Sequence, residues 1–119
     1  MRAWPAALVA LLAAPAWAGE ADVLEVNVIP SAGNSFTFEV TVQHADEGWD
    51  HYADAFEIVA LEGEVLAVRT LYHPHVNEQP FTRSLNNLSI PYSIDRVVVR
   101  ARDSQHGYGG AEIEVELPR

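Results

Sequence analysis

The fold is decided by one stretch that alternates apolar and polar side chains without a break: Phe36-Thr37-Phe38-Glu39-Val40-Thr41-Val42-Gln43. Successive side chains of an extended strand point to opposite faces, so this alternation gathers the phenylalanines and valines on one face. A strand of this kind covers a core with one face and meets water with the other. The stretch therefore predicts an antiparallel sheet that is packed on one side.

The same period-two alternation recurs along the rest of the chain, and no long stretch has helical periodicity. Turn-forming residues separate the alternating segments at regular intervals. Further strands are predicted at residues 24–28, 56–60, 65–71, 81–90, 96–102 and 112–117. Seven short strands in this arrangement predict an all-β immunoglobulin-like or fibronectin type III-like β-sandwich, with a small β-barrel as the alternative.

The pattern also predicts how individual strands pack. Leu24 is expected to face the core together with Val26 and Val28. The hairpin formed by residues 56–60 and 65–71 carries apolar side chains on both faces, so we expect it to be more buried than the other strands.

The last two strands suggest their own pairing register. Folding them about Gly107 places Arg102 opposite Glu112 and Arg100 opposite Glu114. Core residues meet core residues in the same register, as a specified hairpin requires.

Residues 1–18 have the features of a secretory signal peptide. A positive start at Arg2 precedes an apolar run at 3–14, and an Ala-Trp-Ala ending follows. A membrane anchor is the alternative, which the short length of the run disfavours. We therefore expect a single domain at residues 19–119, a periplasmic or secreted location, and no membrane insertion after cleavage.

The composition excludes several kinds of chemistry. The formal net charge of −10 disfavours nucleic acid as a partner. The absence of cysteine rules out thiolate metal centres and thiol–disulfide exchange. The one methionine is Met1, inside the predicted signal peptide, so a methionine-rich copper(I) site is not expected either.

All five histidines fall in or beside three predicted loops, at residues 45–54, 73–80 and 103–110. In the predicted sandwich these three loops share one pole, and the short turns at the other pole contain no histidine. Imidazoles that gather beside carboxylates are suited to binding a metal ion, so this pole is the candidate functional site.

The sharpest element is the string His73-Pro74-His75. Proline favours an extended conformation for the residue before it, and residues i and i+2 of an extended chain point to the same side. Two imidazoles then project together, and Glu78 can add an oxygen ligand. The alternative is a polar loop pinned by hydrogen bonds, in which Arg83 pairs with Glu78 or with an aspartate of the first loop.

His51 is a second candidate ligand, in the first loop. Asp50 and Asp54 flank it and can orient its ring, although they are equally suited to capping a short turn. We expect Trp49 and Tyr52 to close the end of the core.

His106 is the candidate ligand of the third loop, with Asp103 and Tyr108 as supporting residues. His44 continues the apolar side of the 36–43 strand and is expected to be a supporting residue at the rim of the core. Asp103, Ser104 and His106 are neighbours on one loop and cannot form a catalytic relay. We therefore predict no catalytic residue, and hydrolysis at a metal with an open coordination position is left as a third alternative.

Three strings carry a family resemblance: Gly-Trp-Asp-His-Tyr-Ala-Asp at 48–54, His-Pro-His-Val-Asn-Glu-Gln-Pro-Phe-Thr-Arg-Ser at 73–84, and Asp-Ser-Gln-His-Gly-Tyr-Gly-Gly at 103–110. Together they resemble a family of small uncharacterised secreted proteins of Gram-negative bacteria. The resemblance implies a periplasmic address and no particular activity.

The sequence thus predicts a periplasmic binding or accessory protein that holds zinc or copper(II) at its histidine-rich pole. Nitrogen and oxygen donors without sulfur favour these borderline ions. The expected ligands are His73, His75 and His51 or His106, with Glu78 as the carboxylate. The alternative is a metal-free module that uses the same loops and Trp49 to recognise a protein partner in the periplasm.

Overall fold

The computed structural model describes residues 20–119, so the predicted signal peptide lies outside the described residues. The described chain contains seven strands. They are β1 (Asp22–Pro30), β2 (Ser35–Gln43), β3 (Ala53–Ala60), β4 (Val65–Thr70), β5 (Phe81–Ser89), β6 (Arg96–Asp103) and β7 (Ile113–Glu116).

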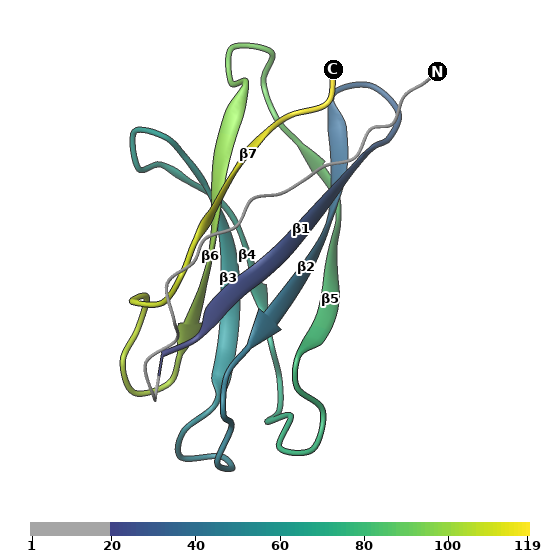
Figure 1. Cartoon of the computed structure of the whole chain (residues 1–119). Helices are drawn as coiled ribbons and strands as arrows, with labels where there is room; N and C mark the ends of the chain where they lie inside the picture. The colour runs from purple at the N-terminus through teal and green to yellow at the C-terminus, as the bar shows by residue number, and fades with distance from the viewer. Residues whose placement is uncertain (1–19) are drawn as a thin grey trace.

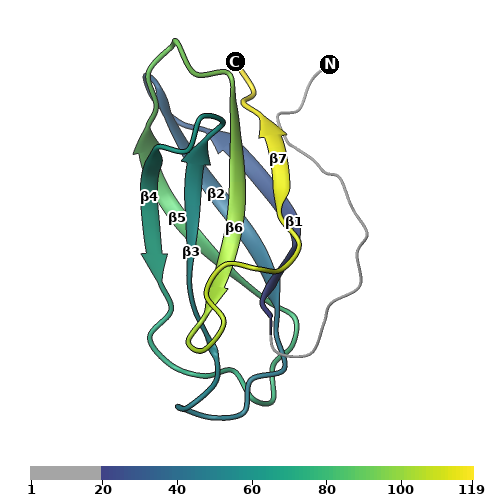
Figure 2. The same ribbon diagram turned by 90° about the vertical axis from the view of Figure 1, so that its left-hand side faces the viewer.

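The strands form two antiparallel sheets that pack face to face (Figure 1 and Figure 2). One sheet has the order β1-β2-β5 and the other β4-β3-β6-β7. Residues 20–119 contain no helix, and hence no helix long and apolar enough to cross a membrane. The predicted all-β class and the number of strands are confirmed.

The decisive stretch forms β2 as predicted. Phe36, Phe38, Val40 and Val42 are all buried, and the polar residues between them are partly exposed. Burying each of these apolar side chains contributes about 1.5–3 kcal/mol. Residues of β1, β3, β6 and β7 complete one core between the sheets.

The expected orientation of Leu24 is wrong. The pairing of β1 with β2 shifts register between Val23 and Glu25, so Val23 is buried and Leu24 is 43% exposed. A β-bulge of this kind adds one residue to a strand and reverses the alternation beyond it. Val26 and Val28 face the core as expected.

The hairpin of β3 and β4 is buried along β3, as expected, but not along β4. All of β3 except Asp54 is buried. The strand β4 lies at the edge of its sheet and is mostly exposed, including Val65 and Val68. The apolar side chains on the outer face of β4 are therefore exposed to solvent.

The predicted register of the last hairpin is wrong by two residues. Arg96 lies opposite Glu116, and Val99 opposite Ile113. A shift of two residues leaves every side chain on its predicted face. Arg100 and Arg102 form their ion pairs across to β3 instead.

The cause of this shift is the segment between β6 and β7. Instead of pairing with β6, Ala111 accepts a hydrogen bond from the backbone N–H of Val23 and donates one to the carboxylate of Asp22. Gly110 permits this approach, because a Cβ there would lie 2.0 Å from the carbonyl oxygen of Ala21. Only from Ile113 onward does the chain return to β6.

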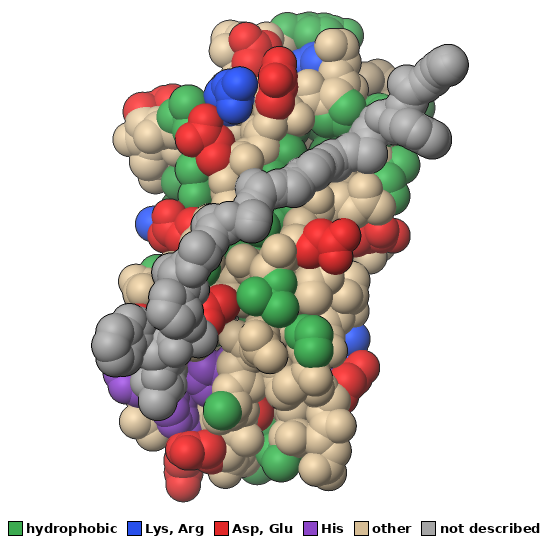
Figure 3. Space-filling model, in the orientation of Figure 1, with side chains coloured by type: hydrophobic (Ala, Val, Ile, Leu, Met, Phe, Trp, Pro, Cys, Tyr) green, Lys and Arg blue, Asp and Glu red, His purple; other side chains and the backbone are tan. Residues whose placement is uncertain are grey.

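The three histidine-bearing loops meet at one end of the sandwich, as predicted, and we call this the loop end. The loops are residues 44–52, 71–80 and 104–112, and Figure 3 shows the histidines gathered there. Hydrogen bonds tie the loops together: His75 N–H donates to Asp46, and Ser104 N–H donates to the carbonyl of Tyr52. Arg119 lies at the opposite end and donates to the carbonyl of Pro91.

Candidate metal centre

Three buried side chains from separate parts of the chain converge at the loop end. They are His44, directly after β2, His51, in the loop before β3, and Asp103, the last residue of β6. One potential ligand atom from each lies within 4.8 Å of the other two. Nε2 of His44 is 3.6 Å from Oδ2 of Asp103, and Nε2 of His51 is 3.5 Å from Oδ1 of the same carboxylate.

The strand pattern explains why His44 and Asp103 meet. His44 continues the inward-facing row that ends with Val42 on β2. Asp103 continues the inward-facing row that ends with Ala101 on β6. Both are therefore polar ends of apolar stripes, and they face each other between the two sheets.

Both histidines of the group have a carboxylate at the other ring nitrogen. Nδ1 of His44 lies 2.5 Å from Asp46, and Nδ1 of His51 lies 2.9 Å from Glu47. A carboxylate in this position favours a proton on Nδ1, while Nε2 of each ring faces the Asp103 carboxylate. Histidines that bind metals in proteins are commonly oriented in this manner.

Asp103 is buried as a carboxylate. Burial alone raises its pKa, but hydrogen bonds from the backbone N–H groups of His106 and Gln105 and from the His106 ring outweigh it and hold the pKa below its usual value. Each backbone donor lies 2.7 Å from Oδ1. Asp103 is thus a negatively charged acceptor held between imidazoles, an arrangement suited to a cation.

His106 lies at the outer edge of this group. Its Nδ1 is 3.1 Å from Oδ2 of Asp103, and its ring centroid is 5.0 Å from that of His51. Its side chain is 42% exposed, so it stands between the buried group and solvent. This position suits either a fourth ligand or a side chain that admits an ion.

The spacing of the group can be compared with that of a common metal site. In a tetrahedral zinc site with ligand distances of about 2.0–2.1 Å, neighbouring ligand atoms lie about 3.3–3.4 Å apart. The two distances to Asp103, 3.5 and 3.6 Å, are slightly longer and run to different oxygens of the carboxylate, and one ligand atom from each of the three residues lies within 4.8 Å of the other two. Two imidazole nitrogens and one carboxylate oxygen form a donor set that zinc and copper(II) both accept.

The predicted pair His73 and His75 lies outside this group. Their ring centroids are 4.6 Å apart, so the two rings do project together as expected. However, the His75 ring is stacked on Phe81, and its Nε2 lies 3.0 Å from the guanidinium of Arg83. Burial, followed by the charge of Arg83, lowers the pKa of His75.

Glu78 and Arg83 form the predicted ion pair at 3.4 Å. The positive charge of Arg83 beside His75 opposes a bound cation there. Around this pair of histidines the described contacts therefore match the alternative interpretation, in which hydrogen bonds and ion pairs pin the loop.

The supporting residues of the first loop are more exposed than expected. Trp49 does not close the core: it is 67% exposed and meets the edge of the Tyr52 ring. Asp50 is exposed, and its backbone carbonyl accepts a hydrogen bond from the Gln105 side chain. Asp54 points outward and pairs with Arg102 at 2.9 Å.

Tyr108, the supporting residue of the third loop, packs against the guanidinium of Arg100. Burial, followed by the nearby Glu57 carboxylate, raises the pKa of Tyr108 to about 12. Its hydroxyl therefore keeps its proton at neutral pH.

Sequence reasoning assigned His44 and Asp103 to supporting positions, whereas the structure places them in the middle of the group. It also did not single out Asp46 and Glu47. A signal for the first two was available, because each extends an inward-facing alternation by one further step. The carboxylates gave no such signal, since their contacts depend on the path of the loop.

A curated relative was found in Halomicrobium mukohataei, where the protein is described as a "putative lipoprotein". It is 40% identical over 97 residues, which cover 82% of this chain. The chain spans only 47% of the length of that relative. No family model matches the chain, and no solved structure matches it.

The match supports the expectation that the chain belongs with other uncharacterised proteins of similar sequence. It covers most of the described strands and loops, since it extends over 97 residues. The Gram-negative origin and the secreted address implied by the family resemblance stay predictions.

Proposed function

We propose that this chain is an extracytoplasmic protein of immunoglobulin-like or fibronectin type III-like fold that binds zinc or copper(II) at its loop end. The ligands are His44, His51 and Asp103. His106 is either the fourth ligand or a side chain that lies between the ion and solvent. Two observations support the proposed location outside the cytoplasm: the predicted signal peptide and the description of the relative as a lipoprotein.

One observation carries this proposal: two imidazoles with carboxylates at Nδ1 direct Nε2 at the same buried carboxylate. Asp103 places a negative charge in this buried position, where hydrogen bonds from the backbone N–H groups of Gln105 and His106 stabilise it. A divalent cation would add a compensating positive charge between the two imidazoles.

The test is titration of the purified protein with zinc and with copper(II), followed by calorimetry. We expect one ion per chain. Trp49 is the one tryptophan among residues 20–119 and lies between His44 and His51 in the chain, so copper(II) should also quench its fluorescence. The double variant His44→Ala/His51→Ala should lose this binding.

His73→Ala is the matched control, because it removes an exposed histidine at the same end of the molecule. It should leave both stoichiometry and affinity unchanged. Circular dichroism of each variant shows whether the fold is retained. If a folded His73→Ala/His75→Ala variant loses the ion while the His44→Ala/His51→Ala variant keeps it, the ligands are those expected from the sequence instead.

A metal-free interaction module is the second candidate function, and exposed apolar residues favour it. Trp49, Tyr72 and Val76 all lie in loops of the loop end and are 67%, 74% and 55% exposed. Aromatic residues on an exposed loop are frequent anchors of protein interfaces. An absence of metal binding above background would favour this candidate, with a protein partner outside the cytoplasm.

A further inference from the structure

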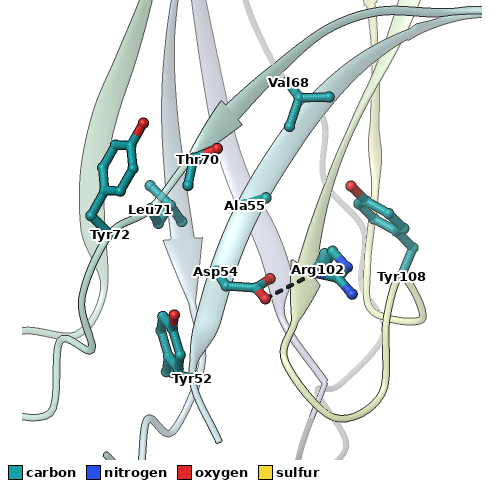
Figure 4. A pocket seen from close by; sticks show the side chains of 9 residues that line it. All are labelled: Tyr52, Asp54, Ala55, Val68, Thr70, Leu71, Tyr72, Arg102 and Tyr108. Carbon is teal, nitrogen blue, oxygen red and sulfur yellow. Dashed lines mark hydrogen bonds and ion pairs between the residues drawn. The ribbon is translucent and has the colours of Figure 1, made fainter. Parts of the chain in front are cut away.

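A second candidate site lies on the outer face of the β4-β3-β6-β7 sheet. It is a hollow of about 430 Å³, within the usual range for small-molecule sites (Figure 4). It is lined by residues of β3, β4 and β6 and of the adjoining loops: Tyr52, Asp54, Ala55, Val68, Thr70, Leu71, Tyr72, Arg102 and Tyr108.

Neighbouring residues of the chain point to opposite sides of this sheet. His51 and Asp103 point inward to the metal group, whereas their chain neighbours Tyr52 and Arg102 line the hollow outside. The hollow and the metal group are therefore built on the same two segments of backbone but open to different sides.

The centre of the hollow carries a balanced pair of charges. The Asp54 carboxylate lies 2.9 Å from the Arg102 guanidinium, and their side chains are 17% and 43% exposed. Each charge is already compensated, so the pair gives no net attraction for a cation or an anion. It does offer an acceptor and further N–H donors side by side, which matches neighbouring hydroxyl groups of one ligand.

Tyrosine rings surround this charged pair. Figure 4 shows Tyr72 and Tyr108 on opposite sides of it, with Tyr52 at the loop end. Tyr72 is 74% exposed, so its ring is accessible to a ligand. Tyrosine combines an apolar ring face with a hydroxyl group, and both are useful for a ligand with polar edges and apolar C–H faces.

We propose that this hollow binds a neutral saccharide. A pyranose ring stacks its C–H face on a tyrosine, donates one hydroxyl hydrogen to Asp54, and accepts a hydrogen bond from Arg102. The inference is independent of the metal group, because no residue of that group lines the hollow.

The experiment is an NMR titration of the isotope-labelled protein with maltose, cellobiose and chitobiose at about 10 mM, which reveals millimolar dissociation constants. At least one of these sugars should shift the backbone amides of Tyr52, Tyr72 and Arg102. Tyr72→Ala should weaken its binding by about three- to tenfold, the contribution of one stacked ring.

The matched control is Tyr92→Ala, since Tyr92 is 71% exposed and does not line the hollow. It should leave saccharide binding unchanged. Glucosamine and glucuronate, which carry opposite charges, should each bind more weakly than the neutral sugar. The proposal is overturned if no neutral sugar shifts these amides, if Tyr72→Ala and Tyr92→Ala behave alike, or if a charged sugar binds best.

Discussion

The two oxygens of the Asp103 carboxylate face different histidines: Oδ1 lies 3.5 Å from Nε2 of His51, and Oδ2 lies 3.6 Å from Nε2 of His44. Both distances lie within the reach of an ion pair, so the carboxylate is placed between the two imidazoles. This position can be tested.

Asp103→Asn should remove the negative charge of this residue while keeping its hydrogen bonds to the loop that follows β6. The amide oxygen can still accept the hydrogen bonds from Gln105 and His106, so the fold should be retained. The affinity for zinc or copper(II), measured by calorimetry, should fall by about 10- to 100-fold or more, because supporting carboxylates of metal sites already contribute that much. Asp50→Asn, at an exposed carboxylate of the same end, should have no effect, and equal losses in both variants would contradict the assigned ligand.

His75 should make the stability of the metal-free protein depend on pH. Its folded-state pKa is lowered from 6.5, so the unfolded chain binds the proton more readily. Its contribution is therefore fully present above pH 6.5 and is lost as the pH falls through the lower folded-state value, by at most about 1.4 kcal/mol per pH unit. Urea midpoints of the wild type and of His75→Gln between pH 8 and pH 5 measure this, and identical slopes for the two proteins would contradict it.

Arg100→Met should destabilise the fold strongly. The guanidinium of Arg100 pairs with Glu57, whose side chain is 5% exposed, and its loss leaves a buried carboxylate without a charged partner. We expect a loss of about 3 kcal/mol, the lower part of the range for broken buried pairs, because Arg100 is itself 32% exposed. Arg96→Met removes two exposed ion pairs, with Glu114 and Glu116, and should cost at most about 1 kcal/mol in urea unfolding.

The bulge in β1 predicts losses of unequal size for two neighbouring residues. Val23→Ala removes buried methyl groups and should cost about 2 kcal/mol, whereas Leu24→Ala should cost less than about 1 kcal/mol because Leu24 is 43% exposed. Thermal or urea unfolding distinguishes them. A larger loss for Leu24→Ala would contradict the bulge and would indicate that Leu24 faces the core, as the sequence pattern predicts.

Most of the fold could be predicted because alternation reports directly which side of a strand is buried. It worked for β2, β6 and β7, whose apolar rows face the core as expected. It failed where pairing depends on distant segments. The bulge after Val23 and the two-residue shift at β7 both depend on how the chain near Ala111 joins β1, which no local pattern encodes.

The candidate site was predictable as a region but not as a set of ligands. Gathering the histidines at one pole follows from topology alone. The choice between His75 and His44 depends on their neighbours: Arg83 and Phe81 surround the first, and Asp46 and Asp103 surround the second. Arg83 and Phe81 lie on β5, Asp103 ends β6, and Asp46 is placed by the path of its own loop, so the spacing of His73 and His75 along the chain could not identify the better-placed residue.

Arg119 and the loop end lie at opposite ends of the sandwich, which has a practical consequence for measurement. A sensor chip or bead attached through a tag after Arg119 would hold the molecule upright, with its histidine loops toward the flowing solution. Ions and sugars would then reach the immobilised protein without interference from the support.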